Sequence, residues 1–313
     1  MINLKKLRLT ALIILLLSLL ALALPMLAGR IYKKLDIFSD SKNSDITLFL
    51  HEKGEKLELS FNEYLLGVLL AQIDGDHHRE TLRAAVVASR SALLYMKGAC
   101  RQLCKADADY CNCESSFRYM GREAYEKDNG DSLSSKLFEL IRESDGEILL
   151  YRDSYALALM HRSSYITTES SYEVYKRSYP YLEPVITAEN PEIKEFFILE
   201  SEILQKLGKY IGERYGAGIP LSPSLKLGRT GRVDSVNLCM CDIPASEFTE
   251  IFGIPSRSFE IKEAYGGLVV TSYGVGDGVG MSLMGADKMC SDGFSYKDVL
   301  LYYFKGCKII SEN

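Results

Sequence analysis

The sequence predicts an α+β fold in which a mixed sheet packs against helices, preceded by one N-terminal transmembrane helix. Helical and strand patterns follow one another without the regular βαβ alternation of a doubly wound sheet. Apolar residues make up 47% of the chain and charged residues 25%, an ordinary globular composition. The net charge of −5 gives no basic field of the kind that nucleic-acid-binding proteins carry.

The N-terminal apolar run predicts the transmembrane helix. Lys5, Lys6 and Arg8 precede the apolar residues 10–29, a run long enough to cross a hydrocarbon core of roughly 30 Å as a helix. Positive residues before the run favour a cytoplasmic N-terminus and an extracytoplasmic remainder. The alternative is a signal peptide that is cleaved near Ala28.

We therefore expect a single-pass protein of the cell membrane in three parts. Residues 1–35 hold a cytoplasmic tip and the anchor, residues 36–60 form a stalk with the first strands, and residues 61–310 form the extracytoplasmic domain. The residues outside the anchor, about 270 in number, are enough for one large core or for two smaller domains.

The clearest element of the extracytoplasmic part is a helix over residues 80–97. Leu82, Val86, Leu93 and Met96 recur there at helical spacing. Alternating or apolar runs predict the strands, and a glycine-dense loop covers residues 274–280. Further helices are expected from residue 61 and at residues 133–142, 202–215 and 298–304, and strands at residues 46–51, 56–60, 148–151, 156–160, 196–199, 233–239, 259–261 and 268–272.

A cysteine cluster follows the long helix, in a loop that runs to residue 114. Cys100, Cys104, Cys111 and Cys113 could converge on a tetrahedral zinc ion, which needs four such ligands. Outside the cytoplasm the same residues could instead form disulfides. Free thiols are the third alternative, and the sequence does not choose among them.

Four sequence blocks, taken together, carry the functional signal. They cover residues 64–74 with the helix at 82–90, residues 161–169 with 179–185, residues 228–232, and the glycine-rich residues 274–286 with 293–306. In order and spacing, these blocks resemble the sporulation stage II protein D family, which includes the LytB amidase-enhancer proteins. The resemblance runs from about residue 60 to residue 310, which is nearly the whole chain outside the anchor.

The resemblance implies a peptidoglycan lytic transglycosylase, which cuts glycan strands without water. One carboxyl group in such an enzyme acts first as an acid and then as a base, so its pKa must be raised. In the family that carboxyl belongs to a glutamate, and Gln72 holds the matching position here. An amide cannot deliver a proton at neutral pH. Asp74 is a candidate for a displaced acid, and the alternative is a protein that binds glycan without cutting it.

The other candidate site residues follow from the same blocks. The resemblance assigns substrate binding to Arg90, His161, Ser163, Ser164, Asp277, Gly278 and Ser282. The chain also departs from the family pattern, because Arg162, Tyr165 and Ile166 stand where the family has small residues or glycine, and Asp277 replaces a histidine.

Cofactors, partners and location follow from the resemblance in the same way. No cofactor is expected to be required for the reaction. Some relatives hold zinc with His and Cys near the cysteine cluster, so a structural zinc ion is a candidate. Expected partners are peptidoglycan glycan strands, a cell-wall amidase and other engulfment proteins, at the membrane around the developing endospore, and no nucleic acid.

Overall fold

The computed structural model describes residues 45–97, 107–113 and 117–311. The expected anchor at residues 10–29 and the cysteines Cys100 and Cys104 lie outside these residues. Within the described ranges, no helix combines the length and the apolar character needed to cross a membrane.

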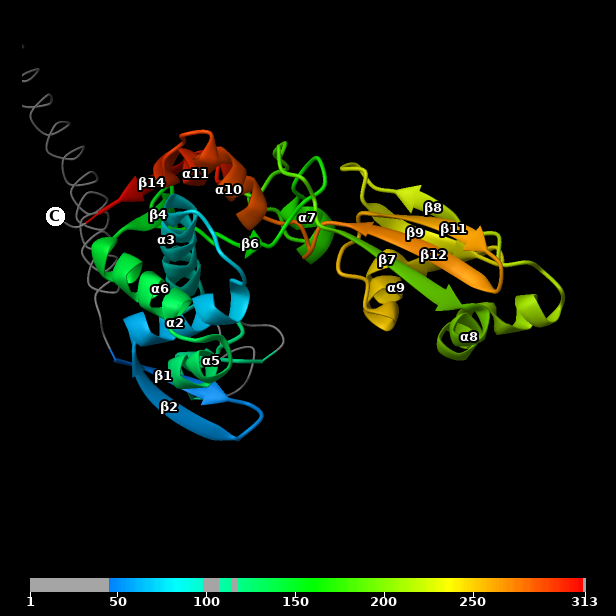
Figure 1. The fold of residues 1–313 in the computed structure, drawn as a ribbon, viewed down its shortest axis with the longest axis horizontal. Coiled ribbons are helices and arrows are strands. Elements are labelled where there is room, and N and C mark those ends of the chain that lie inside the picture. Colours follow the sequence, from blue (N-terminus) through cyan, green and yellow to red (C-terminus); the bar gives the residue numbers. More distant parts are fainter. Residues whose placement is uncertain (1–44, 98–106, 114–116, 312–313) are drawn as a thin grey trace, which may run out of the picture.

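The described chain folds into two lobes with separate hydrophobic cores (Figure 1). The first lobe is built around α3 (Arg79–Met96), which contacts helices α2, α6, α10 and α11 and strand β4. Because these elements surround α3, it is buried on nearly every face. The other elements of this lobe and of the junction are β1 (Asp45–Leu50), β2 (Glu55–Ser60), α2 (Phe61–Gln72), β3 (Tyr110–Cys111), α5 (Arg122–Asn129), α6 (Ser132–Glu143), β4 (Ile148–Tyr151), β5 (Ser154–Tyr155), β6 (Met160–His161), α7 (Ser171–Tyr175), β13 (Met281–Ser282), α10 (Leu283–Ser291), α11 (Tyr296–Tyr303) and β14 (Cys307–Ile310).

The second lobe is formed by the chain between Glu192 and Gly274, and its core is lined by residues such as Phe248 and Leu268. The Gly274 N–H donates to the Glu192 carbonyl at 2.7 Å, so the chain leaves and re-enters the first lobe at one place. The elements of the second lobe are β7 (Ile193–Leu199), α8 (Glu200–Gly216), β8 (Ser224–Leu227), β9 (Val233–Leu238), β10 (Cys241–Pro244), α9 (Ala245–Phe252), β11 (Phe259–Ala264) and β12 (Gly267–Tyr273).

The sheets correct one part of the sequence prediction. The fold is mixed α+β as expected, but the described strands form several small sheets instead of one mixed sheet: β2-β1-β3, β14-β4-β5 and β13-β6 in the first lobe, and β10-β9-β8 and β11-β12-β7 in the second. Pairing is parallel for β1–β3 and β13–β6 and antiparallel for the others. Small sheets are sufficient because helices, rather than a second sheet layer, cover the buried faces.

Helix α2 carries the first candidate site residue at its C-terminal end. Ser60 begins the helix with a capping box, in which its hydroxyl accepts from the Glu63 N–H and the Glu63 carboxylate accepts from the Ser60 N–H. The helix ends at Gln72, and the Ile73 N–H donates to the Leu69 carbonyl at 2.8 Å.

Candidate functional site

Gln72 is half-buried at the end of α2, beside a cavity. The cavity has a volume of about 620 Å³ and is lined by Glu52, Ala71, Asn112, Cys113, Arg118, Tyr119 and Met120. A volume of this order suits a small ligand or part of a polymer. Ala71 lines the cavity, whereas Gln72, the next residue of the helix, is not among its lining residues.

The Asp74 side chain forms an ion pair with an arginine. Its carboxylate forms a salt bridge with Arg162, whose Nε also lies 2.7 Å from a carboxylate oxygen of Glu192. Hydrogen bonds from Lys194 and Arg162 hold the pKa of Glu192 below its usual value. A guanidinium stabilises the charged form of a carboxylate, whereas a general acid must keep its proton until the reaction. In this structure Asp74 is the ion-pair partner of Arg162.

His77 fastens the loop after Gln72 to α10. One ring nitrogen faces the Asp287 carboxylate and the other lies 2.9 Å from the Asp74 carbonyl, so both ring partners are acceptors. The His78 N–H also donates to Asp287 at 2.9 Å. Burial alone would raise the pKa of Asp287, but the hydrogen bonds from His77, Thr81 and the His78 backbone hold it below its usual value. The loop that carries Asp74 is therefore tied to the glycine-rich block.

His161, Ser164 and Arg232 form a buried hydrogen-bonded chain between the lobes. His161 Nδ1 lies 3.2 Å from the Val279 carbonyl, its Nε2 lies 2.6 Å from Ser164 Oγ, and that oxygen accepts from Arg232 at 3.3 Å. Burial lowers the pKa of His161 to about 4, so the ring is neutral at pH 7. A neutral ring with Nδ1–H donating to Val279 accepts from the Ser164 hydroxyl, so both ring nitrogens of His161 have a partner.

Glu189 is a carboxyl group that the sequence analysis did not select. Its Oε1 accepts from the Ser164 N–H and, at 2.7 Å, from the Ser282 hydroxyl. Its Oε2 is buried without a hydrogen-bond partner among the described residues. Burial raises the pKa of Glu189, against the lowering effect of these hydrogen bonds and of Arg232. Of the carboxyl groups of Asp74 and Glu189, that of Glu189 thus has the environment that a proton donor needs.

Glu169, Arg232 and Arg257 form an ionic cluster at the contact between the two lobes. The Glu169 Oε2 accepts from the Thr230 hydroxyl at 2.6 Å and lies 3.9 Å from both the Arg232 and the Arg257 side chains. The Glu169 and Arg232 side chains are each less than 5% exposed. Because a buried charge is costly without a partner, these three side chains hold the second lobe against the first.

Two glycines of the glycine-rich loop lie too close to neighbouring atoms for side chains to fit at their positions. A Cβ at Gly278 would lie 2.3 Å from the Arg232 guanidinium, and a Cβ at Gly276 would lie 2.8 Å from the Cβ of His161. Asp277 lies between them and is exposed. Its carboxylate accepts hydrogen bonds from the Val279 N–H at 2.9 Å and from the Tyr175 hydroxyl. Gly278 thus has a packing role, whereas Asp277 faces solvent.

Gly280→Ala is expected to destabilise the first lobe by at least about 2 kcal/mol. Gly280 has a φ of +82°, and a Cβ there would lie 2.0 Å from the Leu159 carbonyl oxygen. An alanine would therefore have both an unfavourable backbone conformation and a steric clash. Gly293→Ala is the matched control, because its φ is +94° but nothing lies within 4 Å. Urea unfolding measures both changes, and equal losses would show that the clash with Leu159 has no effect.

The remaining candidate residues are buried. Arg90 is fully buried and donates to the carbonyls of Ile141, Ser144 and Glu147, which places it in helix packing. Ser163 and Ser282 are also almost fully buried, and the Ser282 side chain caps α10 by accepting from the Gly285 N–H. The structure thus brings His161, Ser164 and Ser282 together around Glu189 and places Arg90 apart from them.

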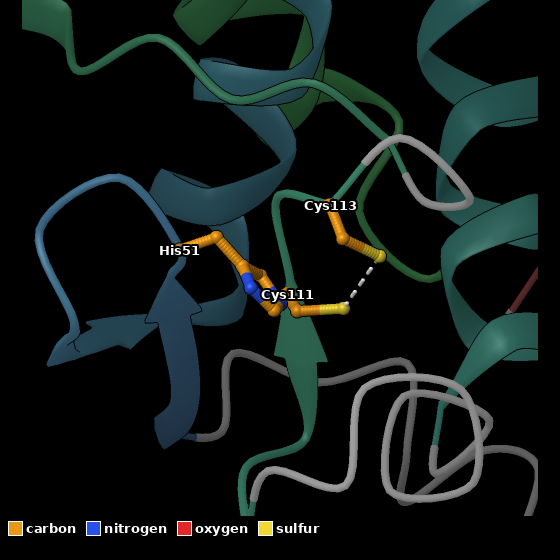
Figure 2. Close-up of side chains that lie close together, drawn as sticks. All are labelled: His51, Cys111 and Cys113. Carbon is orange, nitrogen blue, oxygen red and sulfur yellow. Dashed lines mark hydrogen bonds between the residues drawn. The ribbon is translucent and has the colours of Figure 1, made fainter.

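A histidine that sequence reasoning did not select, His51 in the turn between β1 and β2, lies beside the cysteine cluster. Donor atoms of His51, Cys111 and Cys113 lie within 4.8 Å of one another, and the two sulfurs are 3.3 Å apart (Figure 2). Cys111, however, is disulfide-bonded. A disulfide sulfur is not the thiolate that zinc requires. In this state the described residues supply two donors, fewer than a tetrahedral site needs.

Comparison with known proteins agrees with the sequence blocks. Residues 52–151 match the family model of the stage II sporulation protein. The chain carries a stage II sporulation protein domain. This domain lies wholly within the first lobe and includes α2, α3 and Gln72.

Similarity to individual proteins extends beyond this domain. The chain is 24% identical to stage II sporulation protein D of Bacillus subtilis over 265 residues, which is 80% of this chain and 74% of that protein. It is 24% identical to the protein of the same name from Bacillus amyloliquefaciens, over 80% of this chain and 74% of that one. An uncharacterized protein of Brachyspira hyodysenteriae is 26% identical over 82% of this chain and 68% of its own length.

The polar site is made by first-lobe residues outside the matched range 52–151 together with the second lobe, which explains what sequence reasoning missed. Glu189 lies in an irregular segment, and Arg232 reaches the site from the other lobe. No local pattern marks Glu189, whereas Arg232 closes the third sequence block, residues 228–232. Asp287 directly follows residues 274–286 of the last block and was not selected.

Proposed function

We propose that this chain is a sporulation-associated cell-wall protein that binds peptidoglycan glycan strands and whose lytic step is weak or absent. The similarity to stage II sporulation protein D along four-fifths of the chain carries this proposal. The site supports the second half of it, because an amide ends α2 beside the cavity and Asp74 is paired with Arg162. Strand binding needs neither of these groups to give up a proton.

The setting of this function follows the family resemblance. An apolar helix at residues 10–29 would anchor the chain in the cell membrane, with the two lobes on the extracytoplasmic side. A cell-wall amidase would supply glycan strands without stem peptides, and the chain would present these strands or activate the amidase during engulfment. With Cys111 as a thiolate, His51, Cys111 and Cys113 would supply three of the four donors of a structural zinc site.

One observation favours a chain that still cuts glycan. Glu189 combines a raised pKa with hydrogen bonds that fix its position near Ser164 and Ser282. In this alternative Glu189 would serve as the acid in place of a family glutamate. Glu189→Gln would then abolish the release of 1,6-anhydro-muramic ends, whereas the binding-only function predicts that the variant changes nothing in that assay.

Binding of glycan strands tests the proposed function directly. The full chain in detergent is expected to co-sediment saturably with glycan strands that carry no stem peptides, and to show no such binding to dextran of similar size. Sugar binding of this kind depends on shape and hydrogen bonds, so moderate salt should leave it in place. Equal retention on both polymers would contradict the proposal.

A further inference from the structure

A strained turn projects from the junction of the lobes. The Thr167 N–H donates to the Tyr165 carbonyl at 2.7 Å, and Ile166 between them has a φ of +65°. This three-residue turn with a positive central φ is rare and strained. A β-branched residue is the least suited to such a backbone, yet the Ile166 side chain is 59% exposed, so burial does not compensate the strain. Strain of this kind is usually retained for function.

The turn presents an aromatic surface. The Tyr165 ring stacks on the Tyr273 ring, with centroids 4.7 Å apart and planes inclined by 22°, and the residue remains 40% exposed. The Thr187 N–H donates to the Ile166 carbonyl at 2.8 Å, which fixes the turn against the neighbouring segment. The exposed ring is therefore held in place before any ligand arrives, which reduces the entropy lost on binding.

Polar groups frame this aromatic surface. Tyr273 lies on β12, and its hydroxyl is hydrogen-bonded to Glu260 of β11. Across the sheet Tyr273 pairs with Ile193 of β7, and Glu192 just before that residue is held between Arg162 and Lys194. Acidic and basic side chains both surround the rings, so the frame suits a ligand with many hydroxyl and amide groups and no large charge.

We propose that Tyr165, Ile166 and Tyr273 form a stacking platform for a pyranose ring of the glycan strand. This inference rests on the proposed function. A pyranose ring has an apolar C–H face that fits against a tyrosine ring, while its hydroxyl and acetamido groups reach the surrounding carboxylates and guanidinium. The positions of Tyr165 and Ile166 carry glycine in the family pattern, so the platform is a feature of this chain.

The platform is connected to the Gln72 loop. Arg162 belongs to the same segment as Tyr165, and it forms the salt bridge with Asp74, two residues after Gln72. Only Ser163 and Ser164 separate Arg162 from Tyr165 in the chain. The platform adds affinity beyond the reacting position, which suits a protein that holds strands more than it cuts them.

Affinity for stem-peptide-free glycan strands tests the platform. With the full chain in detergent, Tyr165→Ala is expected to weaken binding about tenfold. Tyr265→Ala is the matched control, because Tyr265 is fully exposed at the β11–β12 turn and has no place in the platform. Ile166→Gly relieves the turn, so it should raise the melting temperature by about 3 °C while weakening binding.

Each result has a defined meaning. If the unaltered chain binds and Tyr165→Ala binds equally well, the platform is wrong and the proposed function stands. If the unaltered chain does not bind glycan strands, both fail. If Ile166→Gly lowers the melting temperature, the turn is not strained and the argument for a retained functional conformation is lost.

Discussion

Gln72→Glu is expected to raise the release of 1,6-anhydro-muramic ends by at least about 100-fold over the unaltered chain. Residue 72 is the last of α2, and the final turn carries no basic residue. The helix carbonyls that point toward it disfavour a negative charge, as does partial burial, so a glutamate there would keep its proton. Mass spectrometry of digests of stem-peptide-free strands measures the change.

Gln72→Asn is the control for this experiment, because it alters size without adding a proton donor. It should release no more anhydro ends than the unaltered chain does. If the unaltered chain already cuts as fast as Gln72→Glu, the acid lies elsewhere, and Asp74→Asn and Glu189→Gln would then identify it.

Arg90→Leu is expected to lower the free energy of unfolding by about 3 kcal/mol or more. Arg90 is fully buried and satisfies three backbone carbonyls around the end of α6, at 2.9 Å for Ile141 and 3.1 Å for Glu147. Burial lowers the pKa of Arg90 to about 10, with Asp145 and Glu147 acting in the opposite direction, so it remains charged at neutral pH. Leucine would remove the Arg90 donors from all three carbonyls, of which that of Ser144 keeps the Glu147 N–H as a donor at 3.0 Å.

Arg79→Ala is the matched control for Arg90, since Arg79 also bridges α3 to α6 but does so at the surface. Its guanidinium lies 2.6 Å from Glu143, and its side chain is 46% exposed. Exposed ion pairs contribute less than about 1 kcal/mol. A loss below 1 kcal/mol for Arg90→Leu in urea unfolding would show that water replaces the guanidinium.

Local pattern predicted individual elements well where one face is buried. The helix expected at residues 80–97 is α3 (Arg79–Met96), and the strands expected at 46–51 and 56–60 are β1 and β2. Helices α5, α7, α9 and α10 were missed; α5 has no buried residue, and only the two residues of β13 separate α10 from the glycine-rich loop. The expected strand at 156–160 is replaced by β5 and β6, whose bridges depend on distant partners.

The site was harder to predict than the fold. Sequence blocks selected His161, Ser164 and Ser282, but Glu189, which accepts hydrogen bonds from Ser164 and Ser282, has no local signal. Periodicity shows which face of an element is buried and not what covers it. For that reason neither the second core nor the arrival of Arg232 at Ser164 could be foreseen.

The adjacency of Glu192 and Gly274 makes the second lobe an insertion whose two ends meet. Such a segment can be gained by an ancestral protein without rerouting the fold that receives it, since the host connection is simply interrupted at one point. Removal is not equally simple in the present chain. Arg232 and Arg257, both in the second lobe, lie 3.9 Å from the Glu169 carboxylate. Excision of the inserted segment would therefore also take both counter-ions away from Glu169.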